Sequence, residues 1–217
     1  AGVNINFAYV LHAAIDETSF ELDDSYRYDG EGDSRRLVFY TSQSSFDTSG
    51  TMLYEYKPFS FGDKQSDATL ANEEPSVALN SANVKVSGYS YTIGERVLTV
   101  KYSYYGKEYT ASLDYVVREP KVERLQQTST AVLPLGVSAT AYHSSFKFDA
   151  IYSDGSVVAR TLSNATIMSV DGAPATSLVT DEPGMHTAVI SYNAGSGSIP
   201  VEGVLIYSVE LVPVYTD

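Results

Sequence analysis

Cysteine and tryptophan are both absent from this sequence of 217 residues, and histidine occurs only three times. The absence of cysteine excludes a disulfide framework, a thiolate metal site and a cysteine nucleophile. Long apolar runs are also missing. Because no stretch of about 18 or more apolar residues occurs, we expect no helix that crosses a bilayer.

Basic residues are scarce: 14 lysines and arginines stand against 27 acids, which gives a formal net charge of −13. A surface this negative repels phosphate backbones and anionic lipid headgroups, so we expect neither nucleic acid nor a membrane as a partner. The apolar content of 43% and the charged content of 19% are those of an ordinary globular protein. At about 100–150 residues per domain, the length predicts two domains.

The acids are concentrated at the start of the chain. Residues 1–34 contain eight acids and one base, which is more than half of the net charge. We therefore expect an acidic N-terminal arm over residues 1–34, a first domain over residues 35–118 and a second domain over residues 119–217. The segment Arg118-Glu119-Pro120-Lys121 marks the boundary between the domains, because proline ends a strand.

The first residues leave two questions open. No basic region followed by an apolar stretch is visible, so the start fits removal of an initiator methionine and cleavage of a signal equally well. Residues 4–15 alternate at first (Asn4-Ile5-Asn6-Phe7), but Ile5, Tyr9 and Ala13 also have helical spacing. We favour a strand over a helix, since valine, isoleucine, phenylalanine and tyrosine fit a pleated sheet.

A two-residue period of apolar side chains dominates the rest of the chain, as is typical of strands with one buried face. The alternating segments are residues 84–86, 97–102, 112–117, 146–152 and 188–192, and residues 204–209 form a more continuous apolar run. Turn-forming pairs such as Asp154-Gly155 and Asp171-Gly172 predict hairpins, because glycine adopts a positive φ at little cost. Short strands at this spacing indicate an all-β sandwich or barrel.

An internal repeat relates the two halves of the chain. Three positions recur at a constant offset of 90 residues: Gly94 matches Gly184, Val100 matches Ile190, and Tyr102 matches Tyr192. A period of about 90 residues is the size of one sandwich domain. The first copy differs from the second by a longer and more polar connection, which we place at residues 57–83.

The repeated segments carry a family resemblance. The hairpin Ala150-Ile151-Tyr152-Ser153-Asp154-Gly155-Ser156, and Glu182-Pro183-Gly184 before the strand at residues 189–192, resemble motifs of the bacterial Ig-like (Big) domain family. The first copy is similar to the same pattern at Val86-Ser87-Gly88-Tyr89, Gly94, Val100-Lys101-Tyr102 and Gly106-Lys107. The resemblance covers residues 36–117 and 121–211.

This resemblance implies an all-β fold with two tandem Ig-like β-sandwich domains, preceded here by the extended N-terminal arm. Such domains serve as spacers, decorations or adhesive modules in bacterial surface proteins, adhesins and phage virion proteins. The family has no shared catalytic set, so it implies no catalytic residue, no cofactor and no metal.

The residues that carry chemistry elsewhere form no recognised motif. His12, His143 and His186 fall on three separate predicted elements, without the close pairing of a histidine zinc site. Asp29, Glu31 and Asp33 alternate with glycines, a pattern that offers oxygens to a hard cation such as calcium. Since Tyr40 stands where a calcium loop has its twelfth-position glutamate, we favour a solvated acidic turn and keep calcium as the alternative.

Aromatic residues are abundant, with 18 tyrosines and 8 phenylalanines. Many belong to the first domain: Tyr54, Tyr56, Tyr89, Tyr91, Tyr102, Tyr104, Tyr105 and Tyr109. Three interpretations are open. The rings belong to the core and strand surfaces, which we favour, to an interface between subunits, or to a platform for a glycan.

Together these observations predict a non-enzymatic structural subunit of a larger assembly, with other protein subunits as its partners. We place it in a phage virion, as a capsid or tail structural or decoration protein, in which the arm adds a strand to a neighbour's open sheet edge. The alternative is an adhesive or glycan-binding Ig-like module of a bacterial surface protein. An enzyme, such as a hydrolase with paired carboxylates, is not favoured, because 27 acids make chance pairs common.

Overall fold

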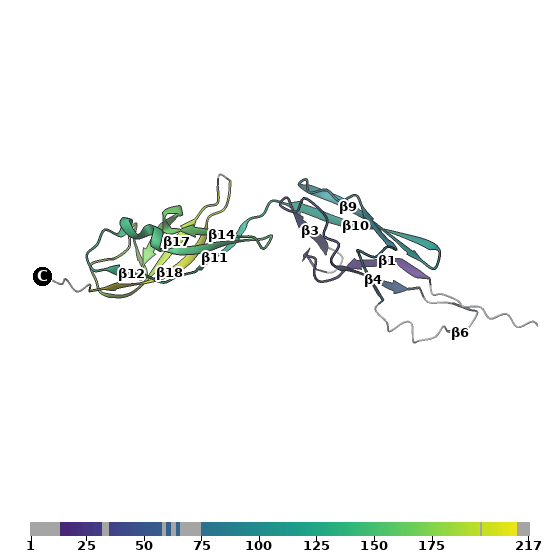
Figure 1. The fold of residues 1–217 in the computed structure, drawn as a ribbon, viewed down its shortest axis with the longest axis horizontal. Helices are drawn as coiled ribbons and strands as arrows, with labels where there is room; N and C mark the ends of the chain where they lie inside the picture. Colours follow the sequence, from purple (N-terminus) through teal and green to yellow (C-terminus); the bar gives the residue numbers. More distant parts are fainter. Residues whose placement is uncertain are drawn as a thin grey trace, which may run out of the picture. The chain divides into compact units, whose positions relative to one another are not determined.

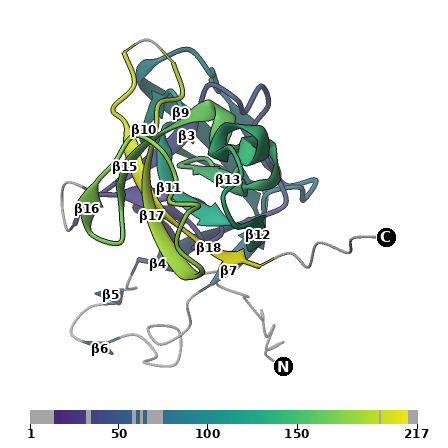
Figure 2. The ribbon, with the colours of Figure 1, turned by 90° about the vertical axis from the view of Figure 1, so that its left-hand side faces the viewer.

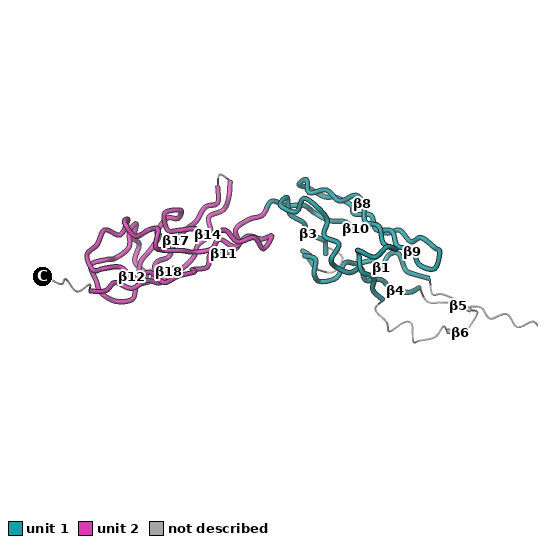
Figure 3. The backbone as a smooth tube through the Cα atoms, viewed as in Figure 1, with its two compact units in different colours: residues 1–119 teal, residues 120–217 magenta. Residues whose placement is uncertain are grey.

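The computed structural model describes residues 14–31, 35–57, 60–61, 64–65, 75–195 and 197–211. The chain divides between Glu119 and Pro120 into unit 1 (residues 1–119) and unit 2 (residues 120–217), drawn in two colours in Figure 3. This division falls within the segment where the sequence places the domain boundary. Both units consist mainly of β-strands, so the protein is all-β (Figure 1).

Unit 1 has two sheets that enclose a core. The first sheet has the strand order β1 (Ile15–Leu22), β4 (Thr51–Tyr56), β7 (Ser76–Ala78). The second has the order β2 (Tyr28–Asp29), β3 (Arg36–Tyr40), β10 (Lys107–Arg118), β9 (Gly94–Tyr104), β8 (Val84–Ser87). A separate pair joins β5 (Ser60–Phe61) to β6 (Lys64–Gln65). Both sheets contribute buried residues to one cluster, among them Phe20, Met52, Leu98 and Tyr115.

Unit 2 repeats this plan. Its three-stranded sheet has the order β11 (Val122–Gln127), β13 (Lys147–Tyr152), β14 (Val157–Thr161). Its five-stranded sheet has the order β12 (Ala131–Pro134), β18 (Val201–Glu210), β17 (Gly184–Tyr192), β15 (Ala165–Val170), β16 (Ala173–Pro174) (Figure 2). Two short 3-10 helices, η3 (Ala139–Ser145) and η4 (Leu162–Asn164), lie in the connections. The buried cluster includes Phe146, Phe148, Ile190 and Tyr207.

Apart from β2, β16 and the β5–β6 pair, the strands of the two units match in order, and their last two strands match in register. In each, a short strand runs parallel to the last strand, β3 beside β10 and β12 beside β18. Each last strand also forms a long antiparallel pair with the strand before it, β9 or β17. Opposite residues coincide: Tyr115 faces Arg96 as Tyr207 faces His186. The repeat in the sequence is therefore a repeat of strand topology.

A buried tyrosine on the last strand holds a loop in both units. In unit 1 the Tyr115 hydroxyl accepts a hydrogen bond from the Ser90 amide (2.7 Å) and donates one to the Ser90 carbonyl (3.1 Å). In unit 2 the Tyr207 hydroxyl bonds the amide and carbonyl of Val179 in the same way, at 3.0 and 3.1 Å. Burial raises the pKa of Tyr207 to about 12, so it stays neutral and serves as both donor and acceptor.

The first part of the chain corrects one expectation. We assigned residues 1–34 to an arm outside the first domain, but Ile15–Leu22 is strand β1, which pairs with β4. Ile15, Phe20 and Leu22 are buried in the unit 1 core. The acids of β1 occupy its outward positions, so their number in the sequence suggested a separate acidic arm where the structure has a strand. Unit 1 therefore includes at least residues 15–31, and residues 1–13 lie outside the described residues.

The long connection predicted at residues 57–83 also contains strands that were not predicted from the sequence. Its later part includes β7, which pairs with β4 at Thr51–Leu53. In the three-stranded sheet β7 occupies the edge that β14 occupies in unit 2. The connection is thus the first copy's route to the same edge strand, with the β5–β6 pair added on the way.

Tyr115 and Tyr207, whose buried hydroxyls each bond the backbone of a loop, are called the clamp tyrosines. Replacing either of them by phenylalanine tests how much this loop contact contributes to stability. Tyr207→Phe leaves the Val179 amide and carbonyl without their partner, and we expect it to lower the free energy of unfolding of unit 2 by about 1–3 kcal/mol. Tyr115→Phe should have the same effect on unit 1. Urea denaturation measures both, and Tyr91→Phe, at a half-exposed ring, is the control. A change below about 0.5 kcal/mol at either clamp would contradict the assignment.

Candidate functional site

Most tyrosines of unit 1 are used in packing. Phe39 makes edge contacts with Tyr26, Tyr89 and Tyr115, with centroid distances between 5.3 and 6.4 Å. A second group, on β4 and β9, joins Tyr54, Tyr56, Tyr102 and Tyr104. These contacts agree with the interpretation that the rings belong to the core and the strand surfaces.

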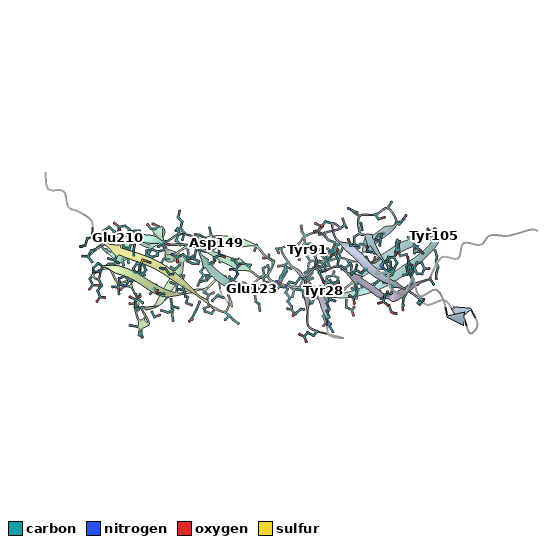
Figure 4. The ribbon with its side chains drawn as sticks, turned by 90° about the horizontal axis from the view of Figure 1, so that it is seen from below. Tyr28, Tyr91, Tyr105, Glu123, Asp149 and Glu210 are labelled. Atoms are coloured by element: carbon teal, nitrogen blue, oxygen red, sulfur yellow. The ribbon has the colours of Figure 1, made fainter. Side chains whose placement is uncertain are left out.

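Among the described residues of unit 1, two tyrosines are largely exposed, and they lie at opposite ends of the unit (Figure 4). Tyr105 is 68% exposed, lies in the β9–β10 turn with a positive φ of 45°, and meets the Tyr104 ring edge-on at 4.6 Å. Tyr91 is 50% exposed and lies just before β9. Stacking on a glycan requires a wide row of exposed rings on one face. The described residues of unit 1 form no such row.

The acidic turn Asp29–Asp33 is only partly described. The Asp29 carboxylate forms an ion pair with the Arg118 guanidinium at 2.6 Å, and it accepts a hydrogen bond from the Gly30 amide. The Arg118 contact holds the pKa of Asp29 below its usual range. Asp33 lies outside the described residues, and no group of three metal-ligating side chains occurs among the described ones. A carboxylate that is already neutralised by arginine is a poor ligand for calcium.

Two of the three histidines belong to unit 2 and are far apart along its fold: His143 lies in η3 and His186 in β17. His12 lies outside the described residues. His186 is only 6% exposed and stacks on Tyr207 with a centroid distance of 5.3 Å. Its Nδ1 lies 2.6 Å from Oδ2 of Asp171, and its Nε2 lies 2.9 Å from the carbonyl oxygen of Glu182.

This geometry determines the protonation of His186. Both ring nitrogens face acceptors, and only the imidazolium form donates from both. The hydrogen bond to Asp171 raises the pKa of His186. Burial opposes this rise but is the smaller effect, so the pKa is raised overall. The same contact lowers the pKa of Asp171. Because Nε2 is engaged by a backbone carbonyl, the pair is not arranged as the acid–base dyad of a hydrolase.

The main surface feature of unit 2 is one that the sequence alone does not predict. On the outward face of its five-stranded sheet lie Val132, Met185, Val204 and Ile206, each between 44% and 65% exposed. Val132 and Met185 flank Ser208 from the two neighbouring strands, and Ile206 and Val204 follow along β18. We call these four residues, with Thr187 and Val189 opposite Ile206 and Val204, the apolar face.

Unit 1 provides an internal comparison for the apolar face. By strand register Met185 corresponds to Glu95, and Ile206 corresponds to Asp114. The outward side of the unit 1 sheet carries ion pairs between Arg36 and Glu95 and between Lys101 and Glu108. The same fold therefore places acids at two positions of unit 1 where unit 2 has Met185 and Ile206, whereas Val132 and Val204 correspond to Val38 and Ser112. An alternating strand predicts that some residues face outward, but not that both faces are apolar.

Comparison with known proteins adds little to this description. No protein-family model matches the chain, and a search of curated proteins gave no match. Among solved structures, a chimeric titin Z1Z2 functionalized with a KLER exogenous peptide from decorin aligns over 94% of this chain and 100% of its own, with 8% identity and a TM-score of 0.25. A TM-score this low does not establish a shared fold. In the described part of the chain, no helix has the length and apolar character needed to cross a membrane.

The buried histidine gives unit 2 a defined pH dependence. Because the folded-state pKa of His186 is raised, its contribution is fully present below about pH 6.5 and is lost as the pH rises through the raised pKa. Thermal unfolding of the full chain followed from pH 6 to 9 should show a falling Tm for unit 2. His186→Gln should remove that slope, whereas His143→Gln, the matched control, should keep it. An unchanged slope in His186→Gln would show that another group titrates.

Calcium should leave the protein unaffected. Since Arg118 already neutralises Asp29, we expect no change in Tm when millimolar calcium or a chelator is added. Differential scanning calorimetry measures this directly. A rise in Tm with calcium that the chelator reverses would restore the calcium interpretation of the acidic turn.

Proposed function

We propose that the protein is a non-enzymatic structural subunit of a larger assembly, built from two tandem Ig-like β-sandwich domains. The observation that carries this proposal is the apolar face of unit 2, where Met185 and Ile206 stand at positions that are acidic in the matching sheet of unit 1. Exposed apolar residues gathered on one face are typical of a protein–protein contact. The matched strand order of the two units supports the Ig-like assignment, because it places a short parallel strand beside the last strand in both.

The proposed assembly is a phage virion, with the protein in the capsid or tail as a structural or decoration subunit. Two features of the chain fit this role. The described cores of both units consist of aromatic and aliphatic residues, which leaves polar recognition of partners to the surfaces. The net charge of −13 disfavours direct contact with the packaged nucleic acid and leaves protein subunits as the partners.

An adhesive module of a bacterial surface protein is the second candidate. The observation that favours it is the exposed ring of Tyr105 at the tip of the β9–β10 hairpin, supported edge-on by Tyr104. A rigid, exposed tyrosine at a loop tip suits a hot spot for a glycan or a receptor protein. Saturable binding on a glycan array that Tyr105→Ala abolishes would favour this role over the virion.

Deleting residues 1–13 tests the proposed assembly. The deletion must stop before Ile15, because β1 is part of the unit 1 core. We expect the shortened chain to keep its Tm and its circular dichroism spectrum but to stay monomeric in sedimentation velocity, at concentrations where the full chain forms larger species. Assembly that is unchanged by the deletion would contradict the proposal. A full chain that stays monomeric at every accessible concentration would also contradict self-assembly.

A further inference from the structure

The apolar face of unit 2 is unusual in its charges as well as in its apolar content. Unit 2 has four bases, and all of them lie on or next to the three-stranded sheet: Lys121, Arg124, Lys147 and Arg160. The five strands of the other sheet contain no lysine or arginine. Their acids are Glu202 and Glu210, near the two ends of β18. The apolar face is therefore uncharged at its centre and acidic at both ends.

This charge pattern argues against a second apolar face as the occupant. If two copies met face to face, the glutamates at the ends of β18 would approach like charges, and the sheet offers no base to neutralise them. It also argues against an acidic segment. The occupant that the face selects is an extended or flat apolar surface without acids.

One segment of the same chain has this character. Residues 1–13 contain no aspartate or glutamate, although acids are frequent from Asp16 onward. Every odd position from Val3 to Leu11 is apolar, with isoleucine, phenylalanine and tyrosine between them. In an extended chain alternate side chains point to the same side, so a segment of this sequence in extended form would present these five side chains as one continuous apolar row. The even positions, Asn4, Asn6 and His12 among them, are mostly polar or small.

The start of β1 and the exit of the chain toward unit 2 lie at opposite ends of unit 1. Strand β1 starts at Ile15 opposite Tyr56, and the Tyr56 hydroxyl lies 3.3 Å from that of Tyr104, beside the β9–β10 turn. The chain leaves unit 1 toward unit 2 at Arg118, the other end of β10. Eleven-residue β9 spans about 33 Å between these ends, whereas thirteen extended residues span about 43 Å. Running back along unit 1 would use most of that length.

On the basis of the function proposed above, we propose that residues 1–13 of one subunit dock on the apolar face of unit 2 of the next subunit. The side chains of Ile5, Phe7 and Tyr9 then cover Val204, Ile206 and Met185. The two surfaces differ, so the contact is head-to-tail, and repetition of a head-to-tail contact produces a ring or an open filament. A segment this short gives a weak single contact that is reinforced by repetition along the assembly.

A labelled peptide of residues 1–13 tests the docking on a chain that lacks these residues. Fluorescence anisotropy should show saturable binding with a Kd of about 10–100 μM. Val204→Lys and Ile206→Lys should each weaken binding at least about tenfold, because a lysine at the centre of the face cannot be covered by an apolar ring. The matched control is Val97→Lys, at an exposed outward position of β9 in unit 1, and it should leave Kd unchanged. If Ile206→Lys fails to fold, Thr187→Lys replaces it, since Thr187 lies directly opposite Ile206 and is exposed.

Two peptide variants with equal charge test the apolar row. Ile5→Asp with Phe7→Asp should abolish binding, whereas Asn4→Asp with Asn6→Asp should change Kd less than about threefold. Binding that is absent, unaffected by the unit 2 substitutions or equally sensitive to both peptide variants would overturn the proposal. If deletion of residues 1–13 abolishes assembly while peptide binding ignores the apolar face, the proposed function stands and the docking site is wrong. If the shortened chain still associates and Ile206→Lys stops it, the occupant is a second apolar face.

Discussion

The pairing of the last two strands is the constraint on which each unit depends. In unit 1 the register of β9 with β10 places Tyr115 under the loop at Ser90, and in unit 2 the register of β17 with β18 places Tyr207 under the loop at Val179. A buried tyrosine that both donates to and accepts from one peptide unit fixes the loop that leads into the strand. A slip by one residue would turn this hydroxyl and the whole apolar row outward. The clamp therefore fixes register, loop position and core at once.

The two units differ in the residue that lies opposite the clamp tyrosine on the neighbouring strand. The residue opposite the tyrosine is Arg96 in unit 1, and it donates to the carbonyl of Ile93. In unit 2 it is His186, which donates to the carbonyl of Glu182 and to Asp171. A cation thus meets the loop carbonyls before the strand in both copies. Arginine is always charged, whereas histidine carries its charge only below its raised pKa, so the second unit alone acquires a pH dependence at this position.

The outward positions of the same strands show how one fold serves two surfaces. In unit 1 they carry ion pairs in water, which stabilise the fold only slightly but keep the sheet soluble. In unit 2 methionine and isoleucine take the places of Glu95 and Asp114, which leaves apolar area in contact with water unless a partner covers it. Most inward positions cannot vary in this way, because their side chains fill the core. The difference in function that we propose therefore lies in side chains that the fold itself does not need.

The sequence by itself determined the all-β class, the strands with clear two-residue alternation and the repeat that aligns Gly94 with Gly184, since these depend only on local periodicity and turn chemistry. It also indicated that most tyrosines are structural. Only the tertiary structure decided that the acid-rich segment Ile15–Leu22 is a core strand, because its few buried residues gain their meaning from pairing with β4. The tertiary structure also brought Val132, Met185 and Ile206 together. These residues come from three different strands, and a surface is a property of neighbours in space and not of any one segment.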